Sequence, residues 1–160
     1  MAQKILIFKI LFLLLLFNSN FLNAKNIIGK PKVIDGDTVH INHNKIRLHG
    51  IDAPEKNQKC MFNKKEWLCG KQATIELKKL IKNEMIKCEI TDVDIYKRYV
   101  GICFVNKTNL NQIMVKNGWA LAYIYYSTDY INEERYARQN KLGVWKGEFE
   151  KPYIFRKKNK

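Results

Sequence analysis

Apolar residues alternate with polar ones along the stretch "TVHINHNKIRLHG". Val39 and Ile41 take alternate positions, and Ile46 and Leu48 do the same after the polar "NHN". A period of two predicts β-strands that are buried on one face, and the short polar break predicts a β-hairpin. Arg47 should therefore lie on the face opposite the apolar one.

Two further segments predict a helix and a second hairpin. In "CGKQATIELKKLIKNE", Ala73, Leu77, Leu80 and Ile81 recur at helical spacing with lysines on the other side, which is typical of an amphipathic helix. The next segment, "MIKCEITDVDIYKRYVGICFV", contains two β-rich runs around a polar, basic turn. This pattern indicates a pair of antiparallel strands.

Capping residues predict the ends of two more helices. Asn109 is an N-cap candidate before the segment that Gly118 ends, and Asp129 and Gly143 have the same roles for a later, more charged segment. The tail from Lys146 has too little pattern for an assignment. Hairpins interleaved with three helices predict a small α+β fold built on a closed or nearly closed barrel.

The first 24 residues, "MAQKILIFKILFLLLLFNSNFLNA", differ from the rest of the chain. An apolar run, polar residues after it and a small residue at Ala24 predict a secretory signal peptide, with one domain over residues 25–160. The alternative is an uncleaved membrane anchor. Lys9 interrupts the run, however, and a membrane span needs about 20 apolar residues.

The chain is strongly basic. It has 29 Lys and Arg residues against 15 Asp and Glu residues, and its formal net charge is +14. This excess favours a polyanionic partner such as nucleic acid, anionic lipid or a cell-wall polymer. The alternative is that the charge serves solubility alone.

The four cysteines all lie after the predicted signal peptide. An even number of cysteines in an exported chain predicts two disulfides. The chain contains no C-x-x-C pair, the pattern that would indicate zinc or redox chemistry. Three pairings are possible. We favour Cys60 with Cys69, which closes a local loop, and Cys88 with Cys103, which face each other if the second hairpin folds around Tyr96.

Two carboxylates flank the first hairpin. Asp37 precedes its first strand and Asp52 follows its second, so the folded hairpin can bring both to one end of the sheet. Two hard oxygen ligands, completed by a backbone carbonyl and water, suit calcium or magnesium better than zinc. The alternative is that "DGD" is an ordinary turn, and Asp35 fits this interpretation even if Asp37 does not.

A third carboxylate and two arginines extend this chemistry. Glu55 follows the rigid Pro54, and a carboxylate beside a metal-bound water can act as a general base. Arg47 and Arg98 could each hold two phosphate oxygens and stabilise charge that develops at phosphorus. Each of these residues alone could be an ordinary surface residue. Their combination is what metal-assisted phosphodiester hydrolysis needs.

Five separated motifs point to a known family. The chain contains, in this order, "IDGDT", "IRLHGIDAPE", "DIYKRYVG", "NGWALAYIY" and "NKLGVW". Their order and approximate spacing resemble the staphylococcal nuclease (thermonuclease) family over nearly all of residues 25–160. The resemblance implies an OB-fold, a five-stranded β-barrel with three α-helices. It also implies a calcium-dependent endonuclease that cleaves DNA and RNA and leaves 3′-phosphate ends.

The resemblance also implies a metal site and a base. Asp37 and Asp52 match the family's calcium carboxylates, and Ala53 matches the position that gives the ion a backbone carbonyl. Glu55 matches the proposed general base. The founding member has threonine where this chain has Ala53, so we expect altered metal affinity or rate with activity retained.

The remaining roles concern the substrate. Arg47 and Arg98 match the family's phosphate-binding arginines, and Tyr96, Tyr123 and Tyr125 resemble tyrosines that line its nucleotide pocket. For Tyr123 and Tyr125 the alternative is packing in the core, because aromatic residues with a period of two usually pack.

The cysteines, which the founding member lacks, resemble those of the exported bacterial branch of the family. This resemblance fits a periplasmic or secreted protein. We also expect a monomeric enzyme that has no stable membrane association after signal cleavage and prefers single-stranded DNA and RNA. Two alternatives remain open. One is a catalytically inactive OB-fold module that binds nucleic acid, and the other is an envelope-binding domain that uses its charge for anchoring.

Overall fold

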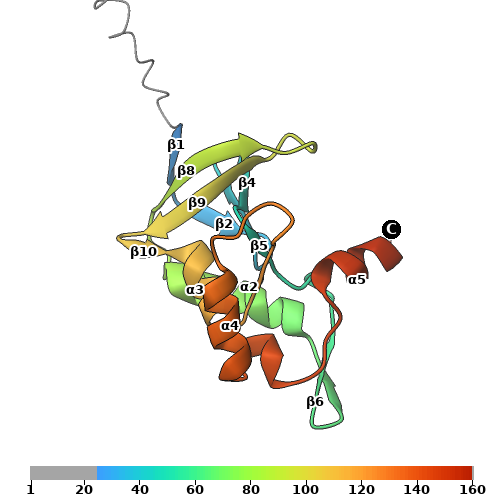
Figure 1. Ribbon diagram of the computed structural model, residues 1–160. Coiled ribbons are helices and arrows are strands. Elements are labelled where there is room, and N and C mark those ends of the chain that lie inside the picture. The colour runs from blue at the N-terminus through green and yellow to red at the C-terminus, as the bar shows by residue number, and fades with distance from the viewer. Residues whose placement is uncertain (1–24, 160) are drawn as a thin grey trace, which may run out of the picture.

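A curved sheet with helices packed beneath it forms the protein, as Figure 1 shows for this computed structural model. The structure describes residues 25–159, so the predicted signal peptide lies outside the described residues. The strands are β1 (Asn26–Gly29), β2 (Pro31–Val33), β3 (Thr38–Ile41), β4 (Asn44–Leu48), β5 (Ile51–Asp52), β6 (Cys60–Phe62), β7 (Lys65–Trp67), β8 (Ile86–Val93), β9 (Tyr99–Val105), β10 (Thr108–Asn109) and β11 (Leu121–Ala122). The helices are α2 (Cys69–Ile81), α3 (Leu110–Lys116), α4 (Ile131–Gln139) and α5 (Pro152–Lys158), with a 3₁₀ turn η1 (Gly143–Lys146).

The main sheet is nearly closed into a barrel. Its strand order is β1-β8-β9-β4-β3-β2, and β4 runs parallel to β9 while the other neighbours are antiparallel. Only Lys30 separates β1 from β2, so one run of chain borders both edges of the sheet. This arrangement confirms the predicted barrel-based α+β fold.

The first hairpin has the predicted register. Val39 pairs with Ile46, and the apolar residues Ile41, Ile46 and Leu48 are buried in the core together with Val39. Arg47 is directed to the opposite face, as the alternation predicts. The hairpin thus separates a core face from a face that can carry polar groups.

Two of the predicted helices form nearly as expected. Helix α2 buries Ala73, Leu77 and Ile81 against the sheet. The side chain of Asn109 caps α3 by accepting a hydrogen bond from the backbone N–H of Gln112.

The start signal predicted for α4 is wrong. The helix begins at Ile131, and its preceding residue is Tyr130, with no side-chain cap. The carboxylate of Asp129 lies 3.4 Å from Nε2 of His49 instead. Asp129 is therefore used in a tertiary contact with the end of the first hairpin, which local sequence cannot show.

Neither the β6–β7 hairpin nor helix α5 was predicted from the sequence. Strands β6 and β7 form a small hairpin directly after the segment that carries Glu55, and α5 forms in the tail that showed too little pattern. Backbone hydrogen bonds between Met61 and Glu148 tie this hairpin to the chain just before α5. Both elements are too short to give a clear periodicity.

Both favoured disulfides are present, Cys60–Cys69 and Cys88–Cys103. The second joins paired residues of β8 and β9, as the predicted hairpin requires. In the chain-entropy account, a disulfide that closes a loop of this length stabilises the fold by about 3 kcal/mol.

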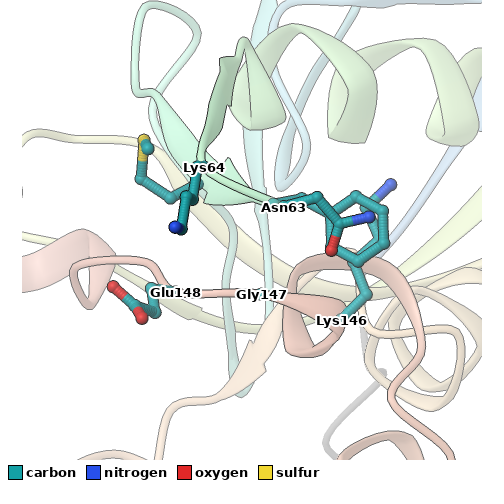
Figure 2. A pocket seen from close by; sticks show the side chains of 7 residues that line it. Asn63, Lys64, Lys146, Gly147 and Glu148 are labelled. Atoms are coloured by element: carbon teal, nitrogen blue, oxygen red, sulfur yellow. The ribbon is translucent and has the colours of Figure 1, made fainter.

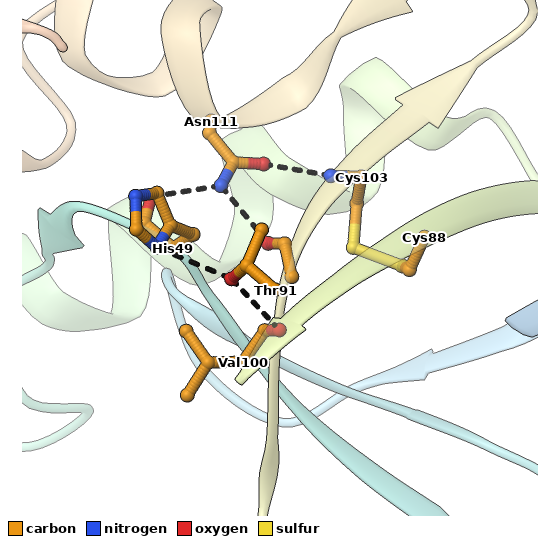
Figure 3. Close-up of a disulfide and its surroundings, with 7 residues drawn as sticks. His49, Cys88, Thr91, Val100, Cys103 and Asn111 are labelled. Carbon is orange, nitrogen blue, oxygen red and sulfur yellow. Dashed lines mark hydrogen bonds between the residues drawn. A yellow bond between two sulfur atoms is a disulfide. The ribbon is translucent and has the colours of Figure 1, made fainter. Parts of the chain in front are cut away.

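The buried Asn111 fastens α3 to the barrel beside this disulfide (Figure 3). Its Oδ1 accepts a hydrogen bond from the N–H of Cys103, and its Nδ2 donates to the carbonyls of His49 and Gly101. These bonds hold the end of β4 against β9. The chain that leads to Asp52 therefore starts from a fixed position.

None of the helices within residues 25–159 has the length and apolar character needed to cross a membrane.

Candidate active site

Arg47 joins the two carboxylates that flank the first hairpin. Its Nη1 lies 3.2 Å from Oδ1 of Asp37, and its Nη2 lies 2.9 Å from Oδ1 of Asp52. Asp37 is 4% exposed and Asp52 is 1% exposed. The hairpin therefore brings the two predicted metal carboxylates to one place, with one guanidinium between them.

The surrounding backbone holds Asp37 firmly. Its Oδ1 also accepts a hydrogen bond from the hydroxyl of Thr38, and its Oδ2 accepts one from the backbone N–H of Ala53. The N–H of Asp37 itself donates to Oδ1 of Asp35 at 3.0 Å. Asp35 thus stabilises the turn before β3, which is the role of an Asx-turn residue.

Asp52 owes its position to the pairing of β5 with β11, in which it faces Leu121. Burial, and after it the negative charge of Asp37, raises the pKa of Asp52, whereas Arg156 and Arg47 lower it. The net shift is upward. A cation beside Asp52 would favour its ionised form and oppose this upward shift.

One atom of Asp52 is an orphan. Its Oδ2 is buried and has no hydrogen-bond partner among the described residues. A buried carboxylate oxygen without a partner is costly unless a ligand or cation reaches it, so the donor set of Asp52 fits a bound cation.

The described residues hold no group of three or more His, Cys, Asp and Glu side chains that could bind a metal. A cation here would therefore need oxygen from the backbone and from water in addition to Asp37 and Asp52. A hard cation accepts such ligands, as the sequence predicts for the carbonyl of Ala53.

The backbone of Glu55 is held by Gln58, which is fully buried. The N–H of Glu55 donates to Oε1 of Gln58, and the carbonyl of Glu55 accepts from the N–H of Gln58 at 2.7 Å. A Cβ at Gly70 would lie only 1.7 Å from the carbonyl oxygen of Glu55, so the start of α2 closely borders this loop. The Glu55 side chain is 35% exposed and remains accessible.

Arg156 was not among the predicted site residues. Its Nη1 lies 2.8 Å from Oδ1 of Asp52 and 2.9 Å from Oε1 of Glu55. The basic tail shows no pattern that predicts a structure, and nothing local distinguishes Arg156 from Lys157 and Lys158 beside it. Only the folding of α5 against the Glu55 loop reveals this contact.

Arg98 and Tyr96 lie apart from this cluster, on the turn between β8 and β9. The Nε of Arg98 donates to Oδ2 of Asp94 at 2.7 Å, and the guanidinium lies 5.5 Å from the centre of the Tyr96 ring. No ion pair of the described residues joins Arg98 to Asp37, Asp52 or Glu55.

Tyr123 lies near the carboxylates because it directly follows β11, the partner strand of β5, and its N–H donates to the carbonyl of Gly50. Burial, and after it the charge of Asp52, raises the pKa of Tyr123. Tyr125 is 81% exposed, and its ring centre lies 6.4 Å from that of Tyr123. The alternative interpretation, in which Tyr125 packs in the core, is therefore wrong.

A separate hollow lies between the β6–β7 hairpin and the chain after η1 (Figure 2). Its labelled residues are Asn63, Lys64, Lys146, Gly147 and Glu148. None of them is a predicted site residue. The candidate site is therefore the carboxylate cluster and not this hollow.

The ionisation of Asp35 gives a testable pH dependence. Burial, and after it the charge of Asp37, raises the pKa of Asp35 from 3.8 to about 7. A raised folded-state pKa contributes stability that is complete below the unfolded value and is lost as the pH rises through the folded value.

Asp35→Asn keeps an acceptor for the N–H of Asp37 but cannot ionise. We expect the variant to match the wild type near pH 4, apart from a constant offset, and to gain about 1–3 kcal/mol relative to it by pH 8. Urea unfolding with a metal chelator present measures this difference. The same pH dependence in both proteins would contradict the raised pKa.

The arrangement can perform acid–base chemistry on an anionic substrate. Asp37 and Asp52 can hold a cation, Glu55 can accept a proton, and Arg47 and Arg156 supply positive charge beside them. These five side chains come from the turn before β3, from β4, from β5, from the loop after β5 and from α5.

Comparisons with known proteins identify the family of this chain. Residues 45–147 match the family described as "Staphylococcal nuclease homologue". The chain is 31% identical over 132 residues to the succinoglycan biosynthesis protein ExoI of Rhizobium meliloti, which covers 78% of this chain and 68% of that protein. It is 32% identical over 131 residues to a micrococcal nuclease of Shigella flexneri, with 71% and 70% covered.

A third relative is an uncharacterised endonuclease of Haemophilus influenzae, which is 31% identical over 128 residues, with 76% of this chain and 67% of the relative covered. The matched region includes Arg47, Asp52, Glu55 and both strands of the second hairpin. The nearly closed barrel, the grouped carboxylates and these similarities lead to one conclusion: the chain belongs to the staphylococcal nuclease family.

Proposed function

We propose that the protein is a calcium-dependent endonuclease that hydrolyses phosphodiester bonds of DNA and RNA and leaves 3′-phosphate ends. Nuclease activity follows from membership of the family. The observation that carries the finer proposal is the pair of buried carboxylates, with the orphan Oδ2 of Asp52 beside the accessible carboxylate of Glu55.

Asp37, Asp52 and the carbonyl of Ala53 would hold the ion. Calcium in this place would supply positive charge to the substrate phosphate. Oxygen-only ligands and the requirement for water in the coordination shell favour calcium over zinc. The loss of the threonine hydroxyl at Ala53 leaves the backbone carbonyl, so binding remains possible.

The chain's own residues account for the proton and the charge. Glu55 takes a proton from water, whose oxygen attacks phosphorus in line with the leaving group. The bond between phosphorus and O5′ breaks, the leaving oxygen takes up a proton, and the products are a 3′-phosphate and a 5′-hydroxyl. Arg47 stabilises the charge that develops on the phosphate oxygens.

Arg98 and three tyrosines would bind the remainder of the substrate. Tyr96 and Tyr125 are 65% and 81% exposed, which suits stacking on unpaired bases. Tyr123 lies closer to the carboxylates, where a phenol can contact a phosphate. An exposed aromatic surface of this kind favours single-stranded DNA and RNA over a duplex.

We also propose that the protein is exported and acts as a periplasmic or secreted monomer in residues 25–160. The two disulfides support an oxidising compartment. The chain carries a net charge of +14, of which Lys4 and Lys9 of the predicted signal peptide contribute 2, so residues 25–160 carry +12 and would attract a polyanion at low ionic strength.

The test of this proposal is cleavage by the purified, oxidised protein. A labelled single-stranded DNA, an RNA of matched sequence and a duplex are each incubated with calcium, with magnesium or with a chelator. We expect calcium to raise the rate by about 100-fold or more over the chelator. The products should carry a phosphate at the 3′ end and a hydroxyl at the 5′ end.

The other outcomes separate the alternatives. Binding of the DNA without cleavage in either metal would support the inactive OB-fold module, and Ala53 would be the first residue to test. Salt-sensitive binding to envelope polymers without turnover of nucleic acid would support the anchoring domain.

A further inference from the structure

The C-terminal segment is fastened to the loop that carries Glu55. The backbones of Met61 and Glu148 exchange two hydrogen bonds, of 2.8 and 2.9 Å, and Nε2 of Gln58 donates to the carbonyl of Glu150 at 2.6 Å. Figure 2 shows the chain at Gly147 and Glu148 running beside the β6–β7 hairpin. The loop that carries Glu55 therefore fixes the position of the segment before α5.

Gln58 connects the two sides of this contact. It is 0% exposed, and its side-chain amide accepts from the N–H of Glu55 while it donates to the carbonyl of Glu150. A buried amide with both ends satisfied restricts the loop and the tail to one relative arrangement.

Helix α5 then delivers one side chain to the carboxylates. Nη1 of Arg156 carries two hydrogens and lies within hydrogen-bond distance of Oδ1 of Asp52 and Oε1 of Glu55. The Oε2 atom of Glu55 has no hydrogen-bond partner among the described residues. One oxygen of the carboxylate is thus held and the other remains open.

The arginines that the sequence predicts do not provide this contact. Arg47 uses its terminal nitrogens on Asp37 and Asp52, and Arg98 pairs with Asp94 on a different turn. Within the described residues, the ion pair of Glu55 is with Arg156. Arg156 also lies beyond residues 45–147, the region that matches the family.

We propose that Arg156 is a positioning residue of the active site, which orients the Glu55 carboxylate so that its free oxygen accepts the proton from water. This inference rests on the proposed nuclease function. It makes the C-terminal helix part of the catalytic apparatus, held there by Gln58 and the β6–β7 hairpin.

The test compares Arg156→Ala with Lys157→Ala in the full-length protein. Lys157 is an exposed neighbour on the same helix, so its variant removes the same charge without touching the carboxylates. We expect Arg156→Ala to lower kcat for a single-stranded DNA by about 10- to 100-fold, the usual cost of losing a supporting contact. KM, and the affinity for the same DNA measured in chelator, should stay close to those of Lys157→Ala.

Two more variants make the role specific. Arg156→Lys keeps a charged donor, so it should recover part of the lost kcat. In a Glu55→Gln background, Arg156→Ala should change kcat little, because the group on which it acts no longer accepts a proton. Thermal unfolding of each variant verifies that it is folded.

Each other outcome overturns the inference in a recognisable way. A kcat equal to that of Lys157→Ala would show that the contact has no catalytic effect. A rise in KM with unchanged kcat would make Arg156 a substrate-binding residue. If Arg156→Ala lowers kcat as much in the Glu55→Gln background as in the wild type, Arg156 does not act through Glu55. A wild type that cleaves no nucleic acid would overturn the proposed function, and this inference with it.

Discussion

Replacing Glu55 with glutamine should lower kcat by about 10²- to 10⁴-fold, the contribution expected of a general base. Glutamine keeps the length and an oxygen that Nη1 of Arg156 can still reach at the Glu55 position, but it cannot take a proton from water. The bonds to Gln58 involve the backbone of Glu55 and are unaffected by the change. The loss should therefore be chemical and not structural.

The measurement is single-turnover cleavage of a labelled single-stranded DNA in calcium, with binding of the same DNA measured in chelator. Glu66→Gln is the matched control, because Glu66 is an exposed glutamate of β7 paired with Lys59. We expect Glu55→Gln to bind DNA like the control. Equal cleavage rates in the two variants would rule out Glu55 as the base.

Arg47→Lys should have the second large effect, a fall in kcat/KM of about 10²- to 10³-fold. An arginine can contact Asp37 and Asp52 through two separate nitrogens and still has N–H groups left to donate to a phosphate. A lysine offers a single point charge instead. The two carboxylates are almost fully buried, so they depend on this partner. We also expect the free energy of unfolding in chelator to fall by about 1–3 kcal/mol.

Kinetics with calcium and urea unfolding with chelator measure the two effects of Arg47→Lys. Arg135→Lys is the control, since Arg135 is exposed on α4 and, among the described residues, its guanidinium donates to Oδ1 of Asn132 and not to a carboxylate. The control should retain wild-type kcat/KM and stability. If Arg47→Lys behaves in the same way, the guanidinium between the carboxylates is dispensable, and the mechanism proposed for it is wrong.

The first hairpin illustrates what alternation can predict. Val39, Ile41, Ile46 and Leu48 have a period of two, and all four are buried as expected. The same reasoning placed Asp37 and Asp52 near each other, because a hairpin returns the chain to its starting edge. The pairing of Cys88 with Cys103 also followed, since their strands are neighbours in the chain.

The start of α4 shows where local signals fail. Asp129 is a good N-cap by type, but it interacts with His49 while the helix begins at Ile131. The choice between a cap and a contact with His49 depends on which groups approach from elsewhere in the fold. A residue type alone does not contain that information.

The candidate site shows the same division. Asp37, Arg47, Asp52 and Glu55 lie close in the sequence, and the motifs around them are sufficient to indicate their chemistry. The sequence does not indicate that Arg47 bridges both carboxylates, because the position of Asp52 depends on the pairing of β5 with the distant strand β11.

The chain by itself determined the two hairpins, the presence of the main helices and the group of acids around the first hairpin, and it favoured the disulfide pairs that form, because each follows from contacts between nearby residues. Only the tertiary structure placed Arg156 on Glu55 and Asp52, about 100 positions away in the chain. It did so through the buried Gln58 and the bonds between Met61 and Glu148, which have no periodic signature. Contacts over such distances depend on how the elements pack, and a local pattern of residues does not specify that packing.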